Sequence, residues 1–141
     1  MRWSWLLLVG LLAAALLAVR RALFVVRIEG VSMEPTYHSG DAVLAVRPPL
    51  GPPVRRGDVV VCRLPVELQG PTGYLVKRVA GLAGDEVADA GVIPPGQVFV
   101  LGDGTSSYDS RRFGALPLSA LRGRVVARLT LAGRPGPAIG G

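Results

Sequence analysis

The feature that most constrains this chain is an uncharged, almost wholly apolar run near its N-terminus. Residues 3–19 read WSWLLLVGLLAAALLAV, and Arg20 and Arg21 follow directly. Roughly 17 residues is the short limit for a bilayer-spanning helix, and membrane interfaces favour tryptophan at one end and arginine at the other. We therefore predict an N-terminal membrane anchor over residues 1–23. Three alanines at 13–15 leave a cleaved signal peptide open as the alternative.

The rest of the 141 residues has room for one small domain. Its short runs rich in valine and leucine alternate with glycine, proline and aspartate, which is typical of an all-β sheet or barrel. No helical period follows residue 30. The expected strands are residues 24–28, 42–46, 59–64, 74–79, 97–101 and 124–131. We predict a mostly β domain over residues 24–132 and a flexible tail over 133–141, where GRPGPAIGG offers nothing to bury.

Positive charge comes almost entirely from arginine. The net charge is +6, and Lys77 is the only lysine among sixteen basic residues. The arginines are spread along the chain without a basic run that alternates with aromatic residues, so we expect no nucleic-acid partner. Cys62 is the only cysteine, which excludes an intrachain disulfide and a cysteine-rich metal site. Its apolar neighbours predict a buried structural thiol.

Lys77 stands in the expected strand YLVKRVAG at 74–81. Alternate residues of a strand share a face, so Lys77 should lie with Leu75 and Val79 while Arg78 points the opposite way. Burial among apolar neighbours disfavours the charged form and lowers a lysine pKa from about 10.4, which would let Lys77 accept a proton. The alternative is a lysine whose stem covers apolar surface while its head reaches water.

A base needs a group to activate, and Ser32 in the segment EGVSMEPT at 29–36 is the candidate. A serine hydroxyl is a weak nucleophile until a neighbouring base takes its proton, and a serine–lysine pair can replace a histidine-based triad. Pro35 keeps this segment out of regular helix and favours an extended, exposed loop. Taken alone, the same pattern also fits a turn without catalytic function.

Four segments together are more specific than either residue. They are SMEPT at 32–36, GDVV at 57–60, KRVAGLAGD at 77–85, and GD at 102–103 with SYDSR at 107–111. In order, spacing and chemistry they resemble the sequence boxes of type I signal peptidases, the S26 family of serine proteases. The resemblance runs from about residue 30 to residue 111.

That resemblance implies a membrane-anchored serine endopeptidase with an antiparallel β catalytic domain, which removes signal or leader peptides from exported precursors after small residues. Ser32 matches the nucleophile, Lys77 the general base, and Ser107 the serine that orients the lysine. The matching charged residues that support the site are Asp109, Arg78, Asp103 and Arg111, and Met33 and Pro35 would lie beside the substrate pockets. The resemblance implies no metal and no cofactor.

The implied partners are precursor proteins and membrane lipid. The implied catalytic domain faces the extracytoplasmic side, whereas the arginines that follow the apolar run nominally favour the cytoplasm. Gly30 stands where some members have a serine, so the oxyanion hole would depend mainly on backbone N–H groups such as that of Ser32. Gly104 stands where asparagine is usual, and only a short loop joins residues 85 and 102, as in a minimal catalytic core.

Three other interpretations remain open at this point. His38 could form a triad with Asp103 or Asp109, although a solvated turn histidine fits its neighbours better. Asp85 could join the same two aspartates in a metal site, although carboxylates on turns usually cap the backbone. A membrane-anchored β domain without catalysis, which binds or scaffolds a partner, is the alternative from another functional class.

Overall fold

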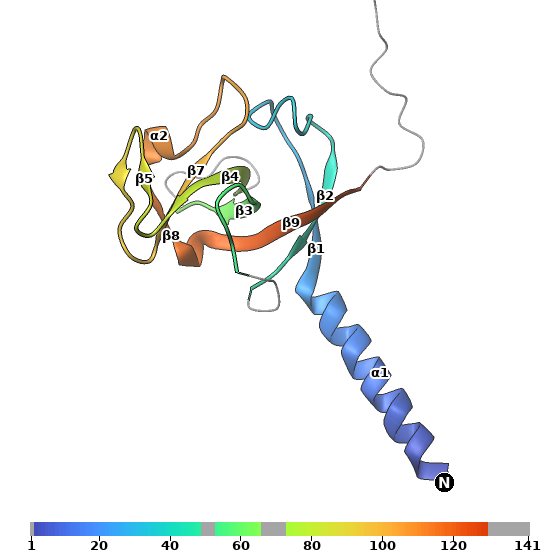
Figure 1. Cartoon of the computed structure of the whole chain (residues 1–141). Helices are drawn as coiled ribbons and strands as arrows, with labels where there is room; N and C mark the ends of the chain where they lie inside the picture. Colours follow the sequence, from blue (N-terminus) through green and yellow to red (C-terminus); the bar gives the residue numbers. More distant parts are fainter. Residues whose placement is uncertain (1, 49–52, 66–72, 130–141) are drawn as a thin grey trace, which may run out of the picture.

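The N-terminal helix projects away from a β domain (Figure 1). The structure is a computed structural model that describes residues 2–48, 53–65 and 73–129. Helix α1 covers Arg2–Ala22, and its segment Trp3–Ala22 has a mean hydropathy of 1.9 with none of its candidate spanning window buried. Twenty residues at 1.5 Å each reach about 30 Å, the thickness of a bilayer core. Helix α1 is therefore long and apolar enough to cross a membrane, as a signal sequence also is.

The remaining described residues form a mostly antiparallel β structure. Its strands are β1 (Leu23–Arg27), β2 (Ala42–Val46), β3 (Val59–Arg63), β4 (Tyr74–Leu82), β5 (Glu86–Val87), β6 (Gly91–Val92), β7 (Gln97–Leu101), β8 (Leu116–Pro117) and β9 (Leu121–Leu129). Seven of these make one sheet in the order β1-β2-β9-β3-β4-β7-β8, and β5 pairs with β6 in a separate hairpin. The predicted mostly β fold is confirmed.

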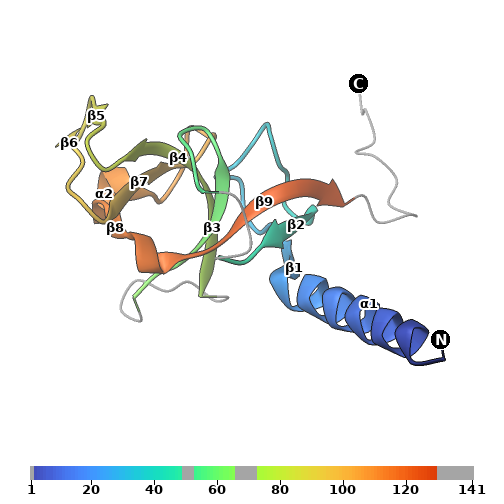
Figure 2. The ribbon, with the colours of Figure 1, turned by 60° about the horizontal axis from the view of Figure 1, so that its bottom comes forward.

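The sheet curls so that strand β3 is buried on both faces (Figures 1 and 2). Val60 and Cys62 belong to one apolar cluster, whereas Val59 and Val61 belong to a second cluster on the opposite face. This explains why the segment reads as a continuous apolar run in place of an alternating one. The predicted buried thiol is confirmed, since Cys62 has no exposed surface and burial raises its pKa to about 12.

Two helical turns depart from the prediction that no helix follows residue 30. They are α2 (Ser110–Phe113) and the 3-10 turn η2 (Leu118–Ala120). Helix α2 begins where the Asp109 carboxylate accepts a hydrogen bond from the Arg111 N–H at 3.2 Å, which caps the first turn. A single turn is too short to show a helical period in the sequence. The end of the last predicted strand, residues 130–131, and the predicted tail, 133–141, lie outside the described residues.

Candidate active site

Ser32 lies in a tight turn that follows strand β1. The Glu34 N–H donates to the Val31 carbonyl at 3.1 Å and the Tyr37 N–H donates to the Met33 carbonyl at 2.9 Å. The segment therefore avoids regular helix, as Pro35 predicts, but it is a compact turn and not the extended loop that we expected. The Ser32 side chain is half-buried and lines a cleft with a volume of about 780 Å³.

Lys77 is almost completely buried, with 1% of its surface exposed. Leu75 and Val79 contribute to one apolar cluster and Val76 to the other, so the predicted alternation of faces along β4 is confirmed. The Lys77 ammonium cannot reach water as the alternative interpretation requires. Its Nζ instead donates to Ser107 Oγ at 3.2 Å. Burial lowers the pKa of Lys77, and the nearby carboxylate of Asp109 opposes this shift only in part.

Ser107 stands between Lys77 and a buried carboxylate. Burial alone would raise the pKa of Asp109, but hydrogen bonds from the Arg111 guanidinium, the Gly102 N–H and the Ser107 hydroxyl outweigh burial and hold that pKa well below its usual range. The Arg111 Nη2 to Asp109 Oδ2 distance is 2.8 Å, and the Gly102 N–H donates at 2.9 Å. Because Asp109 is ionised at neutral pH, it accepts a hydrogen bond from the Ser107 hydroxyl and leaves the Ser107 oxygen free to accept one from Lys77.

Two glycines in the loop after β7 let the Ser32 turn approach Ser107 closely. The Gly104 N–H donates to the Ser32 carbonyl at 2.8 Å. A Cβ at Gly102 would overlap Ser107 Oγ and would lie 2.5 Å from the Ser32 carbonyl oxygen. A Cβ at Gly104 would lie 2.6 Å from the Val31 carbonyl oxygen, so the asparagine that is usual there would displace the turn. The loop after β7 therefore contacts both the predicted nucleophile and the serine that contacts the predicted base.

No hydrogen bond joins the Ser32 hydroxyl directly to Lys77 among the described residues. Hydrogen bonds of a catalytic pair are often long before substrate binds and tighten in the complex. The loop after β7 connects them indirectly, since it contacts the Ser32 carbonyl through Gly104 and Lys77 through Ser107.

Arg78 lies on the opposite face of β4 and forms a paired ionic contact with Asp103. The two nitrogen-to-oxygen distances are 2.8 and 2.7 Å. Thr36 Oγ1 donates to the same carboxylate at 2.6 Å, so Asp103 connects the Ser32 turn to strand β4. Hydrogen bonding from Arg78, helped by Thr36, lowers the pKa of Asp103. Nothing in the segment SMEPT identifies the partner of the Thr36 hydroxyl, so its contact with Asp103 was not predicted.

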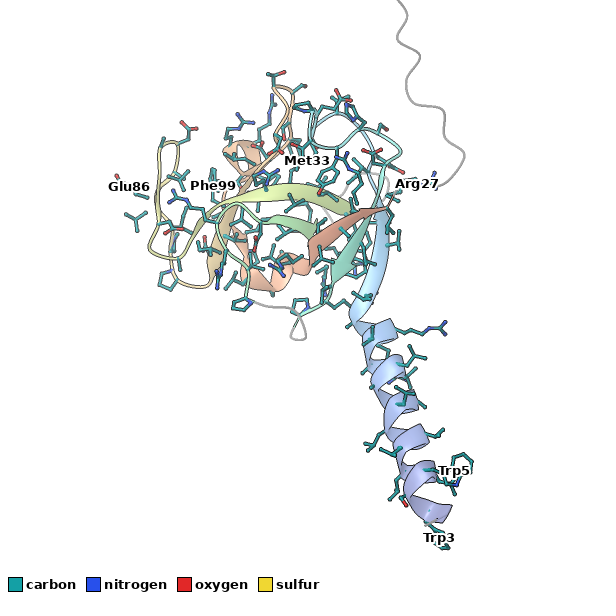
Figure 3. All side chains as sticks on the ribbon, turned by 45° about the vertical axis from the view of Figure 1, so that its right-hand side comes forward. Trp3, Trp5, Arg27, Met33, Glu86 and Phe99 are labelled. Atoms are coloured by element: carbon teal, nitrogen blue, oxygen red, sulfur yellow. The ribbon has the colours of Figure 1, made fainter. Side chains whose placement is uncertain are left out.

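The two residues expected beside the substrate pockets lie in different places. Met33 is 1% exposed and packs in an apolar cluster, and it also lines the cleft with Ser32. Figure 3 shows Met33 within the body of the domain. Pro35 is exposed, and the described lining of the cleft does not include it.

His38 is exposed on the same turn, and its backbone N–H donates to Asp41. In the described part of the chain, no hydrogen bond or ion pair joins the imidazole to Asp103 or Asp109, which contact arginines instead. Asp85 accepts from the Leu82 N–H at 2.8 Å and thus caps a turn. Within the described ranges, no group of three or more histidine, cysteine or acidic side chains is placed to hold a metal.

The cleft follows the free edge of the sheet. Strand β1 is the first strand in the sheet order, and residues 24–28 all line the cleft, which also reaches Ser32. At the other end, its lining includes Arg47 and Tyr74. An edge strand offers unpaired N–H and C=O groups to an extended peptide, so the cleft can take a peptide as an added strand.

Comparison with known families agrees with this geometry. The family model described as signal peptidase, peptidase S26 matches residues 2–92 and 87–130. The chain belongs to the S26 signal peptidase family. This confirms the resemblance that the four sequence segments indicated, and it supports a protease that is associated with a membrane.

Individual relatives of this family member come from mitochondria and bacteria. It is 40% identical over 114 residues to mitochondrial ATP-independent inner membrane protease subunit 1b of Arabidopsis thaliana, covering 71% of this chain and 66% of that protein. It is 34% identical over 118 residues to mitochondrial inner membrane protease subunit 1 of Mus musculus, covering 74% and 68%. Signal peptidase I of Bacillus caldolyticus is 30% identical over 167 aligned positions, covering 88% and 87%. The chain thus spans about two thirds of the length of the mitochondrial relatives.

Proposed function

We propose that this S26 family member is a membrane-anchored endopeptidase that removes signal or leader peptides from exported precursors with a Ser32–Lys77 pair. The observation that carries the proposal is the burial of the only lysine against Ser107, in the loop that also contacts the Ser32 turn. A lysine desolvated in this way can be neutral and act as a base, which an arginine cannot do.

The proposed reaction begins with proton transfer. The Ser107 hydroxyl donates a hydrogen bond to Asp109 and accepts one from a Lys77 N–H, which orients the lysine lone pair away from Ser107. Lys77 takes the Ser32 proton as Ser32 Oγ attacks the scissile carbonyl carbon. The developing oxyanion accepts hydrogen bonds from backbone N–H groups of the Ser32 turn. Gly30 contributes no side-chain donor, and its φ of 79° is one that glycine adopts readily.

The second half of the reaction returns the enzyme to its starting state. Protonated Lys77 donates its proton to the leaving amine as the peptide bond breaks, which leaves an acyl-enzyme on Ser32. A water molecule then gives a proton to Lys77 and attacks the ester carbon, and Lys77 passes this proton to Ser32 Oγ as the bond between Ser32 and the acyl group breaks. The products are a carboxylate, a free amino terminus and the regenerated Ser32 hydroxyl.

The cleft supports precursors as the substrate class. A precursor segment that leaves the bilayer beside α1 can pair with the free edge of β1 and reach Ser32 in extended form. Buried Met33 in the cleft wall leaves limited room next to Ser32, which favours small residues before the cleaved bond. In this proposal the catalytic domain faces the extracytoplasmic side, where translocated precursors arrive.

The test is cleavage of a precursor panel by the purified full-length protein in detergent, with sequencing of new amino termini. Ser32→Ala should fold normally and lose cleavage to near background, because the covalent step disappears. Ser119→Ala, an exposed serine in η2, is the matched control and should keep activity. Unchanged turnover in Ser32→Ala would contradict the proposal. No cleavage of any precursor by the wild type would favour the scaffolding alternative.

A further inference from the structure

The sheet topology gathers a set of arginines at the end of the domain from which the anchor leaves. The pairs Leu23↔Val46, Val46↔Arg124, Cys62↔Leu121 and Arg63↔Tyr74 place the start of β1, β9 and β4 beside the ends of β2 and β3. Arg47 follows β2, Arg63 ends β3, and Arg122 is the second residue of β9. These three exposed arginines, with Tyr74, form what we call the basic edge. Figures 1 and 2 show β1 continuing from α1, with β2 beside it.

The residues of the basic edge line one shared cleft. All three arginines and Tyr74 line one mouth of the cleft that contains Ser32. Arg63 lies 5.9 Å from the centre of the Tyr74 ring. Within the described residues none of the three forms a salt bridge, whereas the ionic contacts there engage Arg78, Arg111 and Arg124. The basic edge therefore keeps its positive charge available to an anionic partner.

The position of the basic edge at the end of the membrane anchor indicates which anionic partner it binds. Arg47 Nη1 donates to the Arg21 carbonyl at 2.9 Å and to the Leu23 carbonyl at 3.3 Å. Arg21 is in the last turn of α1, beyond the uncharged run of residues 3–19 that would fill the bilayer core. The C-terminal end of a spanning helix lies among the lipid headgroups, so Arg47 is held at that level. Tyr74 is 46% exposed, and tyrosine is enriched in this layer.

We propose that the basic edge binds the phosphate groups of anionic phospholipids and so holds the cleft mouth in the headgroup layer. Guanidinium groups match phosphate oxygens with paired hydrogen bonds, and each basic residue beside an anionic leaflet typically strengthens binding roughly fivefold. An acidic peptide in the cleft is the competing partner, but the height fixed by Arg47 favours lipid. The inference depends on α1 spanning a membrane and is independent of the proposed catalysis.

The test uses full-length protein in lipid nanodiscs of phosphatidylcholine with an increasing fraction of phosphatidylglycerol. Leu118→Cys places one exposed thiol in η2, just before β9, for an environment-sensitive fluorophore, while native Cys62 is fully buried. The double variant Arg63→Gln with Arg122→Gln removes two charges of the basic edge and leaves Arg47 at the anchor junction. The charge-matched control is Arg55→Gln with Arg56→Gln, exposed residues in the turn before the opposite end of β3.

We expect fluorescence to rise with phosphatidylglycerol in the wild type and in the control, and to lose at least half of that rise in the double variant. The response should also shrink at high salt. No response in the wild type, or equal responses in both double variants, would overturn the proposal. Inorganic phosphate that abolishes the response at constant ionic strength would indicate a free-phosphate site instead of a lipid one. Arginine-dependent binding of an acidic peptide in neutral detergent, without a lipid response, would assign the edge to substrate.

Two further measurements exclude unfolding of the double variant as the cause of a lost response. Thermal unfolding of all variants in the same nanodiscs checks that the domain is intact. If the double variant unfolds, Arg122→Gln alone, paired with Arg55→Gln, repeats the comparison with one charge on each side. Because the readout is fluorescence, the lipid inference can fail while the peptidase proposal survives, and the reverse also holds.

Discussion

Replacing Gly102 with alanine tests whether the loop after β7 fixes the relative position of Ser32 and Ser107. The new Cβ would overlap Ser107 Oγ, lie 2.6 Å from Ser107 Cβ and lie 2.5 Å from the Ser32 carbonyl oxygen. Ordinary contacts begin near 3.4 Å, so one or both serines must shift by on the order of 1 Å. Misplacement by that amount can cost about 100-fold in rate, and overpacking typically costs about 1–3 kcal/mol of stability.

The assay compares kcat/KM on a cleaved precursor peptide with the melting temperature of the same preparation. Gly81→Ala is the matched control, because its Cβ would lie 2.6 Å from Val87 Cγ2 in the β5–β6 hairpin, away from Ser32. We expect both variants to lose similar stability, several degrees in melting temperature, and only Gly102→Ala to lose about 100-fold in kcat/KM. Gly102→Ala that keeps activity within about threefold of Gly81→Ala would refute the reasoning.

Four further outcomes test the predicted base and its support. Lys77→Arg should fold yet be as inactive as Lys77→Ala, because guanidinium keeps its proton at any workable pH; activity within about tenfold of wild type would redirect attention to His38, whose replacement by alanine should be nearly silent. Wild-type kcat/KM should rise with pH as Lys77 deprotonates, with a midpoint below the ordinary lysine pKa because burial lowers it; a flat profile would argue against a lysine base. Lys77→Met should raise the melting temperature at pH 7, and this gain should shrink toward pH 10. The sign follows because the folded-state pKa lies below the unfolded one, so the cost of burying a charged lysine is present at low pH and is lost as pH rises. Asp103→Asn should lower stability by about 1 kcal/mol at pH 7 and should weaken the loss of stability on acidification below about pH 4, since Arg78 holds the Asp103 pKa down; equal acid melting curves for variant and wild type would contradict this.

The longer strands were predictable from sequence, because each contains a run of about five or more residues rich in valine and leucine between turn residues. The predicted bounds of β2 and β7 agree with the structure, and β4 begins at Tyr74 as expected. Strand β4 continues past Val79 to Leu82. Its register with β7 shifts between Val79 and Gly81, and the two strands remain paired beyond this shift. No period in the sequence indicates such a shift. The two-residue strands β5, β6 and β8 were missed, since two residues cannot display a period.

The candidate site was predictable at the level of residue types and only partly at the level of contacts. The isolated lysine in an apolar strand left both a buried ammonium and one that reaches water open, and the structure shows that Lys77 is buried. The pairing of Arg78 with Asp103, 25 positions apart, agrees with the prediction that Arg78 points away from Lys77. The hydrogen bond from Thr36 to Asp103 was not predictable, because it depends on how a turn folds back over 67 positions. The same reason hid the close approach of Gly102 to the Ser32 turn.

The junction of α1 with β1 has no linker, since the helix ends at Ala22 and the strand begins at Leu23. Arg47 stiffens this junction through two backbone carbonyls and lies 4.4 Å from the centre of the Phe24 ring. Five residues of β1 at about 3.3 Å each span about 16 Å, and the Ser32 turn follows. The connection therefore fixes the distance of Ser32 from the membrane surface. In the proposed reaction, the bond that is cut is selected by its distance from the membrane as well as by the side chains beside it.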